Sequence, residues 1–112
     1  YGMREVKSMN DFDIALIIVL RSYIQKTGAT QRATASEMGI TPTALSKILA
    51  FGQMPTFRQI YLFCEKYDFD ISIMSKLIAK VSQDKALLRS LQECYRYKKR
   101  VDVPLGELLD QV

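Results

Sequence analysis

A short stretch of the chain, residues 41–50, carries polar side chains that could recognise a ligand through hydrogen bonds. Thr43 and Ser46 each have a hydroxyl group that can donate and accept, and Lys47 adds a positive charge. In a helix of this sequence the apolar positions face inward, and the remaining side chains face solvent together. The outward set is Thr41, Pro42, Thr43, Ser46, Lys47 and Ala50. Hydroxyl groups, a cation and small apolar groups are suited to recognising a ligand.

The rest of the sequence offers little for catalysis. It has no histidine for general acid–base work, no glycine-rich phosphate loop and no paired-carboxylate motif. Its two cysteines, Cys64 and Cys94, are thirty residues apart, which leaves too few ligands for a structural zinc site. We interpret both cysteines as buried thiols, and we expect neither an enzyme nor a bound metal or cofactor.

The elements that must position the outward set are two short helices joined by a tight turn. The first is expected over residues 31–38, where Ala35 offers a small face for a close helix crossing. Gly39, four residues later, supplies the left-handed backbone that ends this helix, and Ile40 tucks under the turn. The pattern therefore predicts a helix, a turn and a second helix.

The second helix is expected over residues 42–50. Thr41 suits its N-cap, and Pro42 suits its first position because the missing N–H would be unpaired there anyway. Leu45 and Ile48 form an apolar pair three residues apart, so the side of the helix that carries them is expected to face the core.

Sparse glycine and proline and a hydrophobic period near 3.6 predict an all-helical chain. A preceding helix is expected over residues 11–26, capped by Asn10 or Asp11 and closed at residues 27–28. After a turn at residues 51–55, further helices are expected at 57–67, with Ile60, Phe63, Cys64 and Tyr67 inward, and at 71–81, with Ile71, Met74, Leu77 and Ile78 inward. One five-helix domain would then occupy residues 9–81, followed by a helical extension over residues 84–112.

Residues 28–71 resemble the Cro/CI-type (XRE-like) helix-turn-helix family of phage repressors, plasmid regulators and antitoxins. The residues that carry the resemblance are Thr30 and Gln31, Ala35 and Gly39, Ile40 and Thr41, the run Leu45, Ser46, Lys47 and Ile48, and the loop 52–55. The resemblance implies a lambda-repressor-like domain whose second motif helix enters the major groove of double-stranded DNA.

On this resemblance, the base contacts would come from Thr41, Pro42, Thr43, Ser46, Lys47 and Ala50. This set lacks arginine, asparagine and glutamine, so the shape and deformability of the DNA should carry a substantial share of specificity. The alternative is that Thr41 and Pro42 only start a helix and that Lys47 is solvated.

Phosphate contacts would come from the start of the first motif helix and from the loop that leads into the next helix. The expected residues are Gln31, Arg32, Gln53, Thr56 and Arg58. For Arg32, a solubilising surface role is an equal alternative.

A net charge of +4 permits an acidic partner without requiring one. Residues 28–68 carry four basic and three acidic side chains, whereas residues 84–100 carry six basic and two acidic ones. The basic surplus thus lies downstream of the motif, where Arg96, Lys98, Lys99 and Arg100 could follow phosphates or form a solvated face.

The extension should supply a dimer contact, because one recognition helix contacts few base pairs. Its apolar side chains exceed what a five-helix domain requires, and the expected dimerisation residues are Leu87, Leu88, Leu91, Tyr95, Leu105, Leu108 and Leu109. The alternative is that the extension folds back on its own domain.

The longest apolar run, residues 14–20, is too short for a membrane span of ~20 residues and lacks a cleavage signal, so we expect a cytoplasmic protein. The expected function is that of a transcription regulator, most simply a repressor, that binds a partly palindromic operator as a homodimer. The alternative is a protein-binding module of the same fold, such as an antitoxin that binds a toxin or an antirepressor that binds a repressor.

Overall fold

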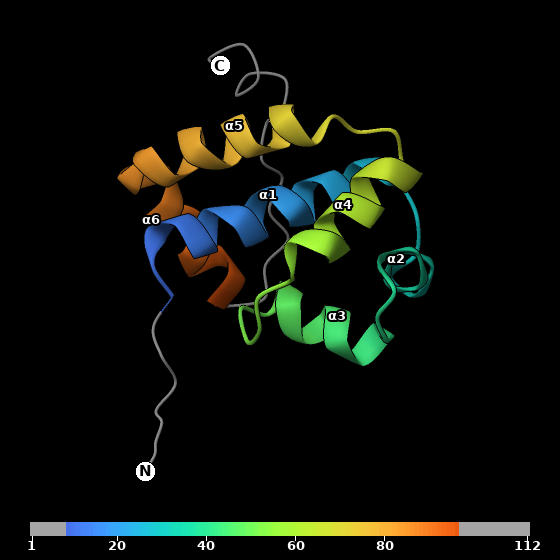
Figure 1. The fold of residues 1–112 in the computed structure, drawn as a ribbon. Coiled ribbons are helices and arrows are strands. Elements are labelled where there is room, and N and C mark those ends of the chain that lie inside the picture. Colours follow the sequence, from blue (N-terminus) through green and yellow to red (C-terminus); the bar gives the residue numbers. More distant parts are fainter. Residues whose placement is uncertain (1–8, 97–112) are drawn as a thin grey trace.

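The computed structural model describes residues 9–96, except for the side chains of residues 92 and 94–96. Within these residues it contains six helices and no strands, which confirms the all-helical prediction. They are α1 (Asp11–Thr27), α2 (Gln31–Met38), α3 (Pro42–Leu49), α4 (Phe57–Lys66), α5 (Ile71–Gln83) and α6 (Lys85–Arg96). α1 runs through the middle of the molecule, between α5 and α3 (Figure 1).

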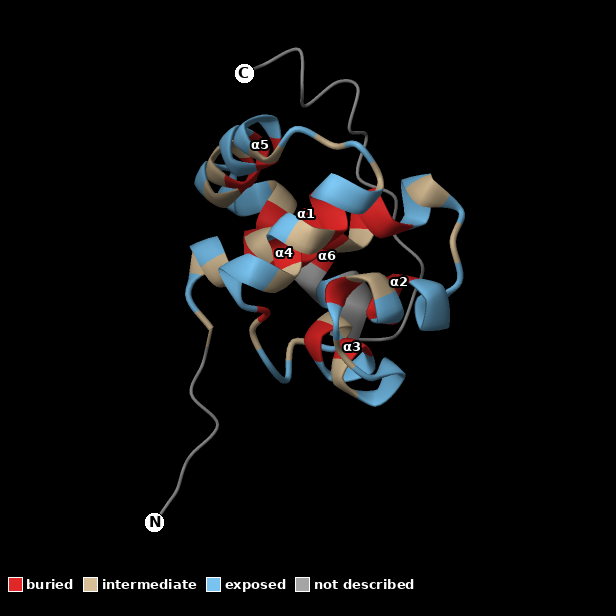
Figure 2. Cartoon of the chain, turned by 45° about the vertical axis from the view of Figure 1, so that its right-hand side comes forward, coloured by how far each residue is buried: buried red, intermediate tan, exposed pale blue. Residues whose placement is uncertain are grey.

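α1 is central because the run of residues 14–20 within it is apolar on every side. Ile17, Ile18 and Val19 occupy successive positions around the helix and all three are fully buried. A helix that is apolar all round must be covered all round, and α3, α5 and α6 pack directly on α1. The buried residues accordingly gather along α1 and on the sides of the helices that face it (Figure 2). Across residues 9–96, no helix has the length and apolar character that crossing a membrane requires.

Side-chain caps fix where the helices begin. The Asn10 side chain accepts a hydrogen bond from the amide of the third residue of α1 at 2.9 Å, so Asn10 and not Asp11 is the cap. Threonine hydroxyls accept the corresponding bonds at the starts of α2, α3 and α4, at distances of 3.0–3.1 Å. These caps are Thr30, Thr41 and Thr56, of which Thr41 confirms the N-cap predicted above for the second motif helix.

The ends of the helices lie within two residues of the predicted positions. α1 ends at Thr27, α3 at Leu49 and α4 at Lys66, whereas α5 continues to Gln83. α5 runs longer than predicted because no residue of its last turn breaks a helix. Asp84 then ends α5, and its carboxylate accepts the amide of Leu87 at 3.0 Å at the start of α6.

An aromatic cluster holds the segment after α4 against α1. The fully buried ring of Phe63 lies 5.1 Å from that of Tyr67 and 5.7 Å from that of Phe69. Phe69 in turn meets Tyr23 of α1 edge to face, with 4.7 Å between ring centroids. The predicted inward faces of α4 and α5 are confirmed, since Ile60, Phe63, Cys64, Met74, Leu77 and Ile78 are buried and Tyr67 and Ile71 are half-buried.

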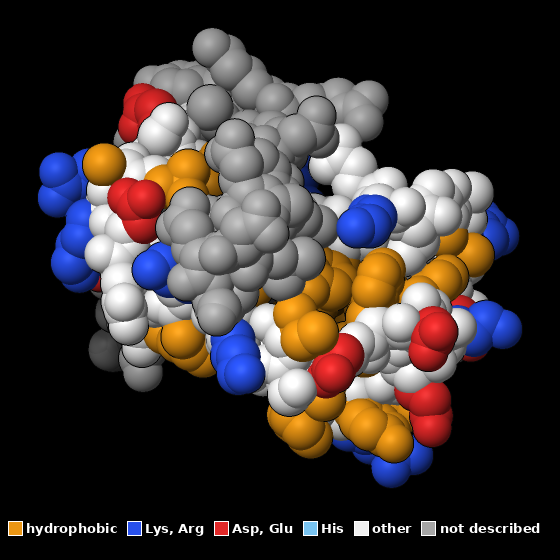
Figure 3. Space-filling model, turned by 90° about the horizontal axis from the view of Figure 1, so that it is seen from above, with side chains coloured by type: hydrophobic (Ala, Val, Ile, Leu, Met, Phe, Trp, Pro, Cys, Tyr) orange, Lys and Arg blue, Asp and Glu red, His pale blue; other side chains and the backbone are white. Residues whose placement is uncertain are grey.

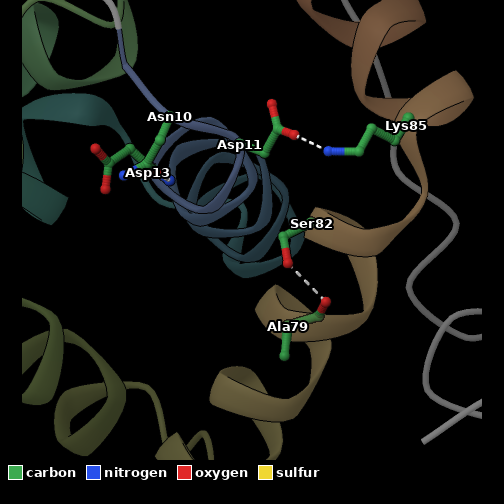
Figure 4. A network of polar contacts seen from close by, with 6 residues as sticks. All are labelled: Asn10, Asp11, Asp13, Ala79, Ser82 and Lys85. Carbon is green, nitrogen blue, oxygen red and sulfur yellow. Dashed lines mark hydrogen bonds and ion pairs between the residues drawn. The ribbon is translucent and has the colours of Figure 1, made fainter.

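In its described part, the predicted extension packs on the domain that precedes it. α6 lies against α1 and α5, and the ammonium group of Lys85 pairs with the carboxylate of Asp11 across the starts of α6 and α1 (Figure 4). Leu88 and Leu91 are only 4% and 6% exposed and belong to the main core.

This packing corrects the expectation that Leu88 and Leu91 form a dimer contact. The apolar face of α6 is covered by the chain's own α1 and α5, so it leaves these two side chains no area for a second copy. Leu87 is half-buried against the same core. The other expected dimerisation side chains, those of Tyr95, Leu105, Leu108 and Leu109, lie outside the described residues.

Candidate nucleic-acid interface

The turn between α2 and α3 is built around Gly39. Its backbone is left-handed, with φ 77°. The amide of Gly39 donates to the carbonyl of Ser36 at 3.1 Å, and the amide of Ile40 donates to that of Ala35 at 3.0 Å. These two bonds close the end of α2 in the manner expected of a glycine-terminated helix. Ala35 is fully buried beneath the crossing of the two helices.

α3 has one buried and one exposed side. Leu45 and Ile48 are fully buried, as predicted, and anchor the helix to the core. The six side chains expected to face outward are all exposed, namely Thr41, Pro42, Thr43, Ser46, Lys47 and Ala50. The structure therefore exposes the whole outward set along one short helix and its two caps, with the hydroxyl groups of Thr43 and Ser46 and the ammonium group of Lys47 at the surface.

A hydrogen bond that the sequence did not reveal joins α2 to this exposed side. The side-chain amide of Gln31, at the first position of α2, donates to the hydroxyl of Ser46 in α3 at 2.6 Å. Gln31 was expected only as a phosphate contact, but it lies beside the outward set. Ser46 keeps its own hydroxyl proton for another acceptor, and Gln31 keeps its carbonyl oxygen and its second N–H.

A second missed residue is Arg21, which fixes the other end of α3. Its guanidinium group, projecting from α1, donates to the carbonyl of Leu49 at 3.0 Å. A cation at a helix C-terminus satisfies a carbonyl that has no intrahelical partner and matches the helix dipole. The available signal was that Arg21 directly follows the apolar run 14–20, where a charge needs a partner.

The loop from α3 to α4 differs from the predicted one in the residue that turns the chain. We expected a turn at residues 51–55 with Gly52 in place, yet the left-handed residue is Phe51, with φ 63°. Gly52 has another role, because its amide donates to the carbonyl of Lys47 at 2.8 Å. A Cβ at Gly52 would lie 3.3 Å from the same oxygen, so a side chain there would crowd the cap.

The expected phosphate contacts all lie on the surface near this loop and at the starts of α2 and α4. Gln31, Arg32, Gln53, Thr56 and Arg58 are each exposed. At α4, the Thr56 hydroxyl accepts from the amide of Gln59, whose side chain accepts from the amide of Thr56 at 2.9 Å. This capping box leaves the first two amides of α4 without an intrahelical acceptor, and the same holds at α2, so both helix starts suit an anion.

The charge of this surface is positive. Between residues 30 and 58 the basic side chains are Arg32, Lys47 and Arg58, and the acidic side chain is Glu37. The carboxylate of Glu37 lies 3.8 Å from the ammonium group of Lys66 in α4, so its charge is partly balanced within the domain. Between residues 30 and 58, three cations, one of them Lys47 on the exposed side of α3, therefore stand against one carboxylate that is already paired.

The thiol of Cys64 lies behind this surface in the core. Burial, reinforced by the negative charge of Asp70, raises the pKa of the Cys64 thiol from 9.0 to about 11. Its sulfur lies 3.7 Å from that of Met74. Cys64 is therefore a protonated thiol at neutral pH, and its burial agrees with the prediction from sequence. The side chain of Cys94 lies outside the described residues.

The comparisons with known proteins add no relative: no protein family model, no curated protein and no solved structure matches the chain. Its function must therefore be argued from its own geometry.

Proposed function

We propose that this protein is a sequence-specific double-stranded DNA-binding protein of the helix-turn-helix type, and that it acts in the cytoplasm as a transcription regulator, most simply a repressor. The observation that carries the proposal is the division of α3 into a buried side, Leu45 and Ile48, and an exposed side of hydroxyl groups and one cation. A short helix held in this way is suited to insertion into the major groove.

The size of α3 sets how much DNA it could read. Eight residues at about 1.5 Å each make a helix of roughly 12 Å, which spans about three to four base pairs. So short a site recurs very often in any genome, and a second copy of the domain would be needed for selectivity. We therefore propose that the protein binds a partly palindromic operator as a homodimer and represses by occluding a promoter.

The chemistry of the exposed side suggests how bases would be distinguished. Thr43 and Ser46 would donate to or accept from base edges, Pro42 and Ala50 would pack on thymine methyl groups, and Lys47 would reach a guanine acceptor or a phosphate. Gln31 joins this group through its bond to Ser46. Because α3 itself has no arginine, asparagine or glutamine, sequence-dependent DNA shape would contribute strongly to specificity.

Phosphate binding would hold the domain in register. The amides at the starts of α2 and α4, together with Arg32, Gln53 and Arg58, would meet the strands on either side of the groove. Arg58 is exposed near the start of α4, so its contact would be independent of sequence.

The second candidate function is a protein-binding module such as an antitoxin or an antirepressor. The observation in its favour is the near balance of charge in residues 28–68, four basic against three acidic side chains, which is modest for a surface that binds a polyanion. Salt dependence separates the two functions, because counterion release from DNA makes affinity fall steeply with salt.

The experiment is the selection of bound duplexes from random DNA, followed by titration of the recovered site at two salt concentrations. We expect an inverted repeat whose affinity falls steeply with salt. Arg58→Ala should weaken binding to all sequences and flatten the salt dependence, whereas Ser46→Ala and Lys47→Ala should change the preference among sequences. Arg89→Ala, an exposed arginine on α6, is the matched control for Arg58→Ala. No enriched site and no salt-dependent binding would refute the proposal and favour the protein-binding module.

A further inference from the structure

α4 carries an exposed aromatic pair that the proposed DNA contacts leave unused. Phe57 is 70% exposed and Tyr61, one turn later, is 46% exposed. Residues four apart lie one above the other on a helix, so the two rings share one side of α4. Among the side chains that the structure describes, Phe57 is the most exposed large hydrophobic one. Seen from above, the molecule has hydrophobic side chains at its surface with acidic and basic ones between them (Figure 3).

Two opposite charges lie beside Tyr61, the second ring of the pair. Arg58 lies three residues before Tyr61, and Glu65 lies four residues after it, with its carboxylate 3.5 Å from the Tyr61 hydroxyl. If two α4 helices cross antiparallel about a two-fold axis at Tyr61, Arg58 of one copy comes level with Glu65 of the other. At about 1.5 Å per residue, the mismatch along the axis is roughly 1.5 Å, which long side chains can accommodate.

We infer that this side of α4 is a homodimer face, on which the Tyr61 rings of two copies pack together at the two-fold axis, Phe57 lies one turn to either side of them, and Arg58 of each copy pairs with Glu65 of the other. A two-fold interface must be complementary to itself, and a helix that carries a cation on one side of Tyr61 and a carboxylate on the other meets that condition. The inference rests on the proposed function, which requires a dimer but does not say which face forms it. The face of α6 that carries Leu88 and Leu91 does not serve, because both side chains are buried in the chain's own core.

The dimer face and the proposed phosphate contact of Arg58 are compatible. A guanidinium group has five N–H donors, which is more than one carboxylate engages. Arg58 lies at the start of α4, directly after the loop that leads from α3. A dimer through α4 would thus place its ion pairs beside the surface proposed to meet the phosphates.

The size of the face predicts a weak dimer. Two partly exposed aromatic rings provide on the order of 200–250 Å² of apolar surface per copy, well below the roughly 800 Å² per partner of a stable interface. We expect concentration-dependent association with a dissociation constant that is micromolar or weaker. Because the aromatic rings supply most of the buried area, Tyr61→Ala should raise the dissociation constant at least tenfold, as loss of a central anchor does, and Phe57→Ala should raise it by a smaller factor.

Sedimentation equilibrium of the full chain in the absence of DNA tests the face. We expect Phe57→Ala and Tyr61→Ala to shift the monomer–dimer equilibrium toward monomer. Phe12→Ala, which truncates a comparably exposed ring on α1, should leave it unchanged. Since all three side chains are exposed, each variant should melt near the wild-type temperature, and a melt of each variant checks this.

Charge reversal tests the antiparallel arrangement itself. Arg58→Glu places two carboxylates opposite each other in a homodimer, and Glu65→Arg places two cations opposite each other, so each variant alone should be monomeric. Mixed together, they should form a heterodimer in which both pairs are restored, and native mass spectrometry distinguishes it by its intermediate mass.

The outcomes separate this inference from the proposed function. A wild-type dimer that is unaffected by Phe57→Ala, with no heterodimer from the mixed charge variants, would overturn the α4 face and leave an operator-binding dimer through another face. A wild-type chain that stays monomeric yet binds selected DNA would overturn both the face and the dimer, but not DNA binding. A dimer with the expected variant behaviour that binds no DNA would uphold the face and refute the DNA-binding proposal.

Discussion

Gly39→Ala should destabilise the domain through the backbone alone. Gly39 has φ 77°, where an L-residue with a Cβ is less stable by about 1–2 kcal/mol. A Cβ at this position would meet Leu62 Cδ1 at 4.0 Å, which is an ordinary contact and adds no collision. Alanine also restricts the unfolded chain, which returns about 0.4–1 kcal/mol. The net loss in the free energy of unfolding should be about 1 kcal/mol, or roughly 4–8 °C in melting temperature for a domain of this size.

The assay is thermal and urea unfolding followed by circular dichroism, with two further variants as controls. Gly39→Asn should lose less stability than Gly39→Ala, because asparagine adopts the left-handed region more readily. Gly52→Ala should also destabilise the domain, but by another mechanism, since its Cβ would lie 3.3 Å from the Lys47 carbonyl that accepts the Gly52 amide. A Gly39→Ala variant as stable as the wild type, or no advantage of asparagine over alanine, would refute the backbone argument.

Three further predictions concern other parts of the fold. Asp68→Gly should stabilise the domain by about 0.5–1 kcal/mol, measured by urea unfolding, because Asp68 is exposed and holds a left-handed φ of 60° at the end of α4; an unchanged or lower midpoint would contradict this. Arg21→Met keeps the apolar stem but removes the bond to the Leu49 carbonyl, and should cost about 1–2 kcal/mol in the same assay, whereas equal stability would show that the bond contributes nothing. Because burial raises the pKa of the Cys64 thiol to about 11, the unfolded chain loses that proton first as pH rises, so stability should fall between about pH 9 and pH 11. Burial also raises the pKa of Tyr23, with smaller contributions from Cys64 and Asp70. A Cys64→Ala variant should therefore lose the fall in stability nearest pH 9 and keep the fall above pH 10. If the stability of this variant depends on pH as that of the wild type does, the thiol is not the source of the fall.

The helices could be predicted from sequence because local residues decide where they begin and end. The threonine caps at positions 30, 41 and 56 bond to amides within their own helices, and Gly39 meets a requirement of its own backbone. The inward positions of α3, α4 and α5 follow from the same periodicity that defines the helices.

The remaining features depend on contacts between residues distant in sequence. Nothing local to Gln31 indicates that its amide meets Ser46, because that contact depends on the angle at which α2 and α3 cross. Leu88 and Leu91 are buried because α1 and α5 offer them an apolar surface. The sequence of α6 alone does not indicate that this surface exists. The left-handed Phe51 was missed because Gly52, the usual residue for such a position, lies next to it.

The position of α3 is fixed from three directions, and this bears on how so plain a set of side chains could read DNA. The Gly39 turn holds its start, the Gln31 bond holds its middle and the Arg21 bond holds its end. Serine and threonine side chains have few rotamers to lose on binding. In the proposed complex, the entropy cost of ordering them would therefore offset little of the free energy of their hydrogen bonds. Discrimination among DNA sequences by such a preorganised helix, with its short side chains, would depend on how well the shape of the groove fits the helix. We therefore expect that loosening α3 at either end, by Arg21→Met or Gly39→Ala, would reduce discrimination among DNA sequences more than it reduces binding to DNA in general.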